Sequence, residues 1–209
     1  MHRPLLPVIT IAITLFIALP AAAEDIEILV ELIGVKCGNT EDVTGADEFY
    51  VLSAFTGGTL DSSNSAITRP ISINDGQSKV FPETDAVMIH ALVPATGKIA
   101  GLMRAYDEDY AKTWETMRIS VEQATKEISA AAAAEGSDED VKMAESLEAG
   151  FAVYDELASL DDDDVLDTVE VNIRATGPTE EIKTWTMVRE GLGFSTWEYT
   201  VTYRITRSR

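Results

Sequence analysis

Aspartates in three separate places are the residues of this chain whose type and spacing could do chemistry. Asp107 and Asp109 lie two apart at the end of an apolar run, and four consecutive aspartates occupy 161–164. A third group, Asp42 and Asp47, lies in the stretch EDVTGADEFY. Carboxylates from several loops suit Ca²⁺, because this ion takes about six to eight hard oxygen ligands. The three groups are therefore candidate parts of a calcium site.

Helix capping and solvation are the competing interpretations of the same carboxylates. Asp107 or Asp109 could cap a following helix, where an aspartate satisfies free N–H groups. The run 161–164 would instead follow a helix C-terminus, where each carboxylate is unfavourable by some tenths of a kcal/mol up to about 1 kcal/mol. Such a run is tolerated when water solvates it or when a cation neutralises it. The residues by themselves leave both interpretations open.

Residues 110–160 are expected to bring the second and third groups together. Apolar residues recur there at steps of three and four, which is typical of amphipathic helices. Two such helices joined by a short turn form an antiparallel hairpin and return their ends close together. The sequence thus predicts an inserted helical hairpin that projects from the domain. Its two apolar stripes are Trp114, Met117, Val121, Ala124 and Ile128, and Ala144, Leu147, Phe151, Tyr154 and Leu157.

After residue 23, most of the remaining sequence consists of short apolar or alternating runs separated by turn signals such as Asn74-Asp75-Gly76. This pattern predicts β-strands. Eight such strands favour an antiparallel sandwich, so we expect a mainly β domain over 24–209 with the hairpin inserted. The expected strands are one beginning at Ile26, then Phe49–Phe55, Ala66–Ile73, Val87–Val93, Lys98–Tyr106, Val165–Ala175, Lys183–Arg189 and Trp197–Thr206.

Two of the acidic stretches resemble the calcium loops of C2 domains. DVTGADEFYV is similar to the first such loop, and Asp107-Glu108-Asp109 followed later by Asp164-Val165-Leu166 is similar to a later one. The resemblance implies an eight-stranded, C2-like β-sandwich that binds Ca²⁺, with the hairpin inserted in the later loop. The metal ligands that it implies are Asp42, Asp47, Asp107, Asp109, Asp163 and Asp164.

The first 23 residues and the net charge bear on compartment and partners. Arg3, an apolar stretch and the small residues Ala21–Ala23 predict a secretory signal peptide, so we expect a periplasmic or extracellular protein cleaved near Ala23. The net charge of −20 disfavours nucleic acid, whose phosphates need Lys and Arg. It also makes contact with anionic lipid dependent on bridging calcium. Cys37 is the single cysteine, which excludes an intrachain disulfide and favours a buried thiol.

Nothing in the sequence indicates an enzyme. His90 is the one histidine after the signal peptide, and it lies in an apolar run where a core or sheet-face position is expected. Trp185 and Trp197 fall at expected core positions, and common catalytic and zinc motifs are absent from the sequence. Two functions stay open: a calcium-binding C2-like module whose loops present a surface to an unknown partner, and a metal-independent interaction sandwich that binds through its hairpin.

Overall fold

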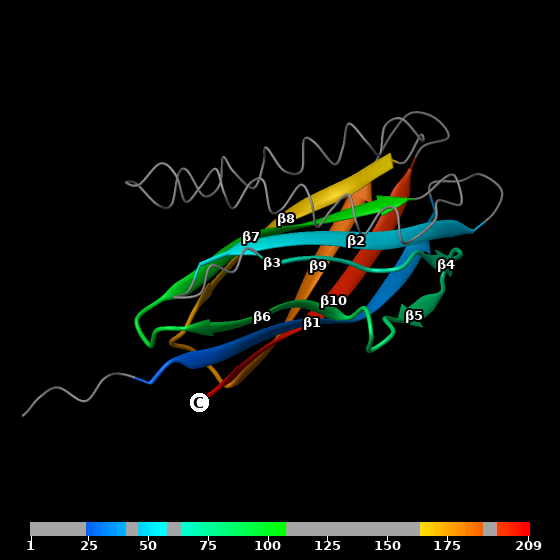
Figure 1. The fold of residues 1–209 in the computed structure, drawn as a ribbon. Helices are drawn as coiled ribbons and strands as arrows, with labels where there is room; N and C mark the ends of the chain where they lie inside the picture. The colour runs from blue at the N-terminus through cyan, green and yellow to red at the C-terminus, as the bar shows by residue number, and fades with distance from the viewer. Residues whose placement is uncertain (1–23, 41–45, 58–63, 108–163, 190–195) are drawn as a thin grey trace, which may run out of the picture.

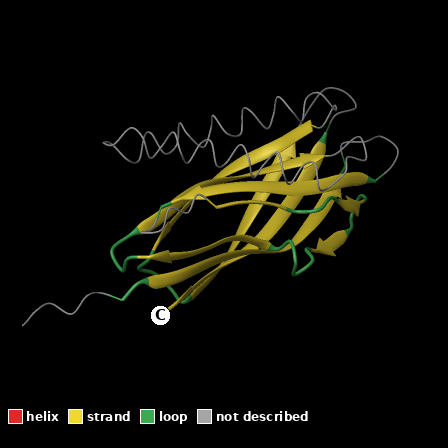
Figure 2. Cartoon of the chain, in the orientation of Figure 1, coloured by secondary structure: helices red, strands yellow, loops and turns green. Residues whose placement is uncertain are grey.

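The computed structural model describes residues 24–40, 46–57, 64–107, 164–189 and 196–209. These residues form two antiparallel five-stranded sheets that lie face to face as a sandwich (Figures 1 and 2). The expected mainly β fold is therefore confirmed. The hairpin predicted over 110–160 and the signal peptide predicted over 1–23 lie outside the described residues. Within the described part of the chain, no helix is long and apolar enough to cross a membrane.

Sheet A is built around its longest strand, β1, which pairs with β10 along one edge and with β6 and then β5 along the other. The sheet ends at β9, which pairs with β10. Its strands are β1 (Ile26–Asn39), β5 (Ser78–Val80), β6 (Val87–Val93), β9 (Glu180–Arg189) and β10 (Trp197–Ser208).

Sheet B has the same plan, with β2 pairing with β7 on one side and with β3 and β4 in succession on the other. The sheet ends at β8, which pairs with β7. Its strands are β2 (Asp47–Thr56), β3 (Asn64–Ile67), β4 (Ile71–Ile73), β7 (Lys98–Asp107) and β8 (Asp164–Arg174).

The described residues contain ten strands, where the sequence predicted eight. The strand expected over Ala66–Ile73 is split into β3 and β4, because Pro70 has no N–H to donate to the β2 ladder. Thr68 bridges the break, since its hydroxyl accepts the N–H of Val51 at 3.0 Å and its own N–H donates to the Val51 carbonyl at 2.9 Å. β5 is the second addition, a short strand with no apolar alternation of its own.

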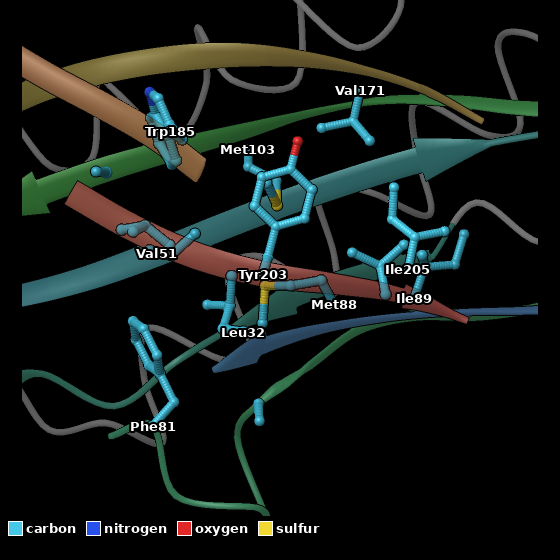
Figure 3. Packing of buried hydrophobic residues seen from close by; sticks show 14 of the residues in the cluster. Leu32, Val51, Phe81, Met88, Ile89, Met103, Val171, Trp185, Tyr203 and Ile205 are labelled. Atoms are coloured by element: carbon cyan, nitrogen blue, oxygen red, sulfur yellow. The ribbon is translucent and has the colours of Figure 1, made fainter. Parts of the chain in front are cut away.

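The core lies between the sheets and follows the period-two pattern of the strands. Along β1, Ile28, Val30 and Leu32 are buried, as their alternation predicted. Figure 3 shows Val51 and Met103 of sheet B in the same packed group as Leu32, Tyr203 and Ile205 of sheet A. Both sheets therefore depend on burial of one shared apolar layer, which is the main stabilising contribution to a sandwich.

Candidate functional site

One end of the sandwich gathers the described acidic residues that the sequence singled out; we call it the acidic end. β2 begins there with Asp47, β7 ends there with Asp107, and β8 begins there with Asp164. Asp107 and Asp164 are directly paired in the β7–β8 ladder, and Asp107 is also paired with Phe49 of β2. The strand pairing thus brings the backbones of Asp47, Asp107 and Asp164 to the same end of the sandwich, although these residues are far apart in the sequence.

Asp47 is buried between the sheets, with 1% of its surface exposed. Its Oδ2 accepts a hydrogen bond from the hydroxyl of Tyr199, a fully buried residue of β10 in the opposite sheet. The Tyr199 ring packs at 5.1 Å from the ring of Phe49, measured between centroids. This hydrogen bond therefore ties sheet B to sheet A inside an aromatic environment.

Asp107 is also buried, with 3% of its surface exposed, and its Oδ1 accepts the N–H of Glu48 at 2.9 Å. The sequence placed Asp47 and Asp107 in loops, and this was wrong. Both continue the inward-facing alternation of their strands, Asp47 in phase with Phe49 and Asp107 in phase with the buried Ala105. The ladder hydrogen bonds at the strand ends hold them in extended backbone, so both side chains point between the sheets.

The surroundings of these carboxylates are negative. Burial, the hydrogen bond to Asp47 and the charges of Asp47, Cys37 and Asp107 together raise the pKa of Tyr199 far above its ordinary value. Burial also raises the pKa of Cys37 to about 11, although its hydrogen bond to Tyr199 acts in the other direction. Nearby carboxylates, Asp47 among them, raise it further. Cys37 is fully buried, as its sequence context predicted.

Asp75 is a further acidic residue at this end, and the sequence analysis treated it only as part of a turn. Its Oδ1 accepts the N–H of Thr40 at 2.8 Å and the hydroxyl of Thr40 at 2.9 Å. These hydrogen bonds lower the pKa of Asp75. They also tie the residue that follows β1 to the turn between β4 and β5, where Gly76 adopts a positive φ of 71°. The position of this turn beside Asp47 follows from pairing of β4 with β2, which no local signal marks.

Of the six predicted ligands, Asp47 and Asp107 have described side chains, and both lie at the acidic end. Asp164 is described by its backbone, while Asp42, Asp109 and Asp163 lie outside the described residues. Among the described residues, no three His, Cys, Asp or Glu side chains are grouped so that they could hold a metal ion. The described part of the predicted site is thus two buried carboxylates and one neighbouring strand position.

The remaining candidates from the sequence lie elsewhere and serve the fold. His90 is on the outer face of sheet A, with its Nε2 at 2.5 Å from a carboxylate oxygen of Glu27. Trp185 and Trp197 are buried, and the indole N–H of Trp185 donates to Asp167 at 2.8 Å. These placements agree with the sheet-face histidine and core tryptophans that the sequence predicted.

Comparison with known proteins assigns no family. No protein-family model matches the chain, and no curated protein matches it. Among solved structures, human GIVD cytosolic phospholipase A2 is similar at 12% identity and a TM-score of 0.43, over 90% of this chain and 17% of that one. The same enzyme in complex with a methyl gamma-linolenyl fluorophosphonate inhibitor and terbium chloride gives 12% and 0.44, over 90% and 18%. A likeness at this level does not assign a function.

Proposed function

We propose that this chain is a secreted, non-enzymatic, C2-like β-sandwich module that binds Ca²⁺ at its acidic end. The observation that carries the proposal is the burial of Asp47 and Asp107 between the sheets, beside the strand position of Asp164. The sequence adds Asp42, Asp109 and Asp163 as further ligands. On this proposal the bound metal orders the adjoining loops, which then present a surface to a partner.

The physical support is the cost of burying negative charge. A carboxylate removed from water is strongly unfavourable unless it is hydrogen-bonded and its charge is compensated. Asp47 accepts a hydrogen bond from the Tyr199 hydroxyl, and Asp107 accepts one from the Glu48 N–H. The charges of both carboxylates act together on Tyr199, so they share one region of negative potential. A divalent cation at the acidic end would compensate it with the hard oxygen donors that calcium prefers.

The partner and compartment follow from the same charge and from the N-terminal sequence. The predicted signal peptide supports a periplasmic or extracellular location. A net charge of −20 opposes binding to nucleic acid, and it restricts contact with an anionic membrane to contact bridged by calcium. The expected partner is therefore a protein or another surface that recognises the metal-organised loops.

Calcium titration of residues 24–209, followed by thermal unfolding, tests the proposal. At about 100 times the dissociation constant, a ligand that binds only the folded state adds about 2.7 kcal/mol. The melting temperature should then rise by roughly 5–10 °C, at about 2–4 °C per kcal/mol. Magnesium should raise it much less, because it demands strict octahedral geometry and retains its waters.

Two double variants give the test its control. Asp107→Asn with Asp164→Asn should abolish the calcium shift, and without calcium it should be neutral or stabilising because crowded negative charge is removed. The asparagine at 107 retains an oxygen that can accept the Glu48 N–H. Asp25→Asn with Glu180→Gln removes the same charge from exposed residues at the opposite end and should leave the calcium shift intact. If sodium chloride at equal ionic strength gave the same shift as calcium, the chain would be a metal-independent interaction sandwich instead.

A further inference from the structure

Part of the outer face of sheet B, over β2, β3 and β7, is apolar and buried, although the core lies on the other side of the sheet. Arg104 of β7 also lies on this face, opposite Leu52, and its Nε donates to the Thr168 hydroxyl of β8 at 2.7 Å. β2 alternates between inward residues such as Phe49 and Val51 and outward residues, and both sets are buried. Six buried apolar residues stand outside the core cluster between the sheets. We call them the outer apolar face: Tyr50, Leu52 and Ala54 of β2, Ile67 of β3, and Leu102 and Tyr106 of β7.

Strand register joins these residues into one continuous surface. Tyr50 is directly opposite Tyr106, and their rings stack with centroids 4.9 Å apart and planes 10° apart. Leu102 is opposite Ala54 on the same pair of strands, and Leu52 is opposite Ile67 on the β2–β3 pair. Both tyrosines have 0% of their surface exposed. Side chains with this degree of burial are covered and do not face water.

Sheet A shows what a solvent-facing surface of this sandwich looks like. Its outer face carries threonines paired across β9 and β10, Thr184 with Thr202 and Thr186 with Thr200. The guanidinium of Arg204 there lies 2.8 Å from the carboxylate of Glu31. Antiparallel sheets with one wet face alternate apolar and polar residues in this way. Sheet B departs from that pattern at its two central strands, so its outer face is built to be covered by another layer.

We propose that the segment 108–163 covers the outer apolar face, with its predicted amphipathic helices lying along sheet B as a third layer. The segment leaves the end of β7 directly after Asp107 and returns at Asp164, the first residue of β8. It is therefore attached at both ends to the sheet whose face needs a cover. Residues 58–63, which connect β2 to β3, are too few to form a layer.

The predicted helices also match the outer apolar face in length and in sequence pattern. The first predicted stripe, Trp114–Ile128, would be roughly 21 Å long as a helix. The part of β2 from Tyr50 to Ala54 is roughly 13 Å long, so one such helix spans it. An amphipathic helix on one face of an antiparallel sheet is a common stable layer arrangement. This proposal replaces the expectation that the hairpin projects from the sandwich, and it is independent of the proposed calcium site.

Thiol labelling of the full chain tests the proposal. In a Cys37→Ala background, which removes the one native thiol, Leu102→Cys places a thiol in the outer apolar face, opposite Ala54. Thr202→Cys places a matched thiol at mid-strand on the outer face of sheet A. We expect labelling by an aqueous maleimide to be at least about 100-fold slower at position 102 than at 202, because a covered site reacts only when it opens. Ala54→Cys repeats the measurement on β2, should Leu102→Cys fail to fold.

Substitutions in the segment identify the cover. Leu147→Ser with Phe151→Ser, both on the second stripe, should raise the labelling rate at position 102 by about 10-fold or more. Glu145→Ser with Glu156→Ser, on the opposite side of the same predicted helix, should leave it unchanged, and neither pair should alter labelling at 202. Fast labelling at 102 and 54 in the otherwise unaltered chain would overturn the proposal. Protection that persists in the stripe variant, or that disappears on dilution as expected for a second copy, would also overturn it.

Discussion

Replacement of Tyr199 by phenylalanine is the perturbation that the structure defines best. The change removes one hydroxyl and keeps the ring, so the packing against Phe49 is preserved. The change removes the hydrogen bond to the buried carboxylate of Asp47, which joins β10 to β2 across the core, and also the hydrogen bond with Cys37 of the neighbouring strand β1. Because the acceptor Asp47 is charged and buried, the variant mainly measures how much this inter-sheet link contributes to stability.

The expected cost follows from the charge and burial of the acceptor. A hydrogen bond to a charged group contributes about 1.5–3 kcal/mol, and a buried acceptor left without its donor adds a desolvation cost. At about 2–4 °C per kcal/mol, the melting temperature should fall by roughly 3–12 °C. The cost should not depend on added calcium if Asp47 keeps this bond in both states.

Thermal unfolding followed by circular dichroism at neutral pH is the assay, and Tyr203→Phe is the matched control. Tyr203 is two residues further along the same strand and is also buried on the inner side, with 7% of its surface exposed. Its replacement should shift the melting temperature by no more than about 2 °C, because the hydrogen bond to the buried Asp47 is made by Tyr199 and stays intact in this variant. Equal shifts for the two variants would show that the Tyr199–Asp47 bond carries no special stability, and the reasoning about a costly buried carboxylate would fail with it.

Two further predictions rest on Cys37 and on Gly101. Burial raises the pKa of Cys37 from 9.0 to about 11 in the folded state. The contribution of the buried thiol to the free energy of unfolding is therefore complete below pH 9 and is lost as the pH rises to 11. Stability should fall by about 2–3 kcal/mol over that range, and Cys37→Ala should flatten the decline in melting temperature measured from pH 8 to 11; parallel declines would contradict this. Gly101→Ala should lower the melting temperature by roughly 5–10 °C, because the new Cβ would meet the Phe55 ring and lie 2.5 Å from the Ala54 carbonyl oxygen, whereas Ala100→Ser beside it should be nearly neutral.

The strands were predictable where the signal is local. Alternation from Ile26 to Leu32 and from Trp197 onward follows directly from one buried face, and both strands are present. β5 was missed because the sequence Ser78–Val80 has no apolar face, and the strand exists only through pairing with β1. At Gly34 that pairing is close, since a Cβ there would lie 2.8 Å from the Lys79 carbonyl oxygen. Such a strand is determined by tertiary contact and leaves no periodic trace.

The outer apolar face did leave a signal in the sequence. Phe49–Phe55 is an almost continuous apolar run, which is typical of a strand buried on both faces and not of a strand with one wet face. The position of Asp47 could not be found in this way. Its partner Tyr199 lies 152 residues away in sequence, and only the packing of the two sheets brings the pair together.

The placement of Asp47 and Asp107 at strand ends changes how a metal site here would work. A ligand on a mobile loop must be ordered when the ion binds, and the entropy of that ordering weakens binding. Asp47 is already oriented by a hydroxyl from the opposite sheet, and Asp107 by a backbone N–H of the neighbouring strand. Two of the six proposed ligands are therefore fixed by the same contacts that hold the sandwich together, and rigid elements position ligands more accurately than loops do. The cost is borne by the metal-free fold, which must keep two carboxylates buried close to Tyr199. The same two buried carboxylates should therefore lower the stability of the metal-free fold and raise its stability when calcium is bound.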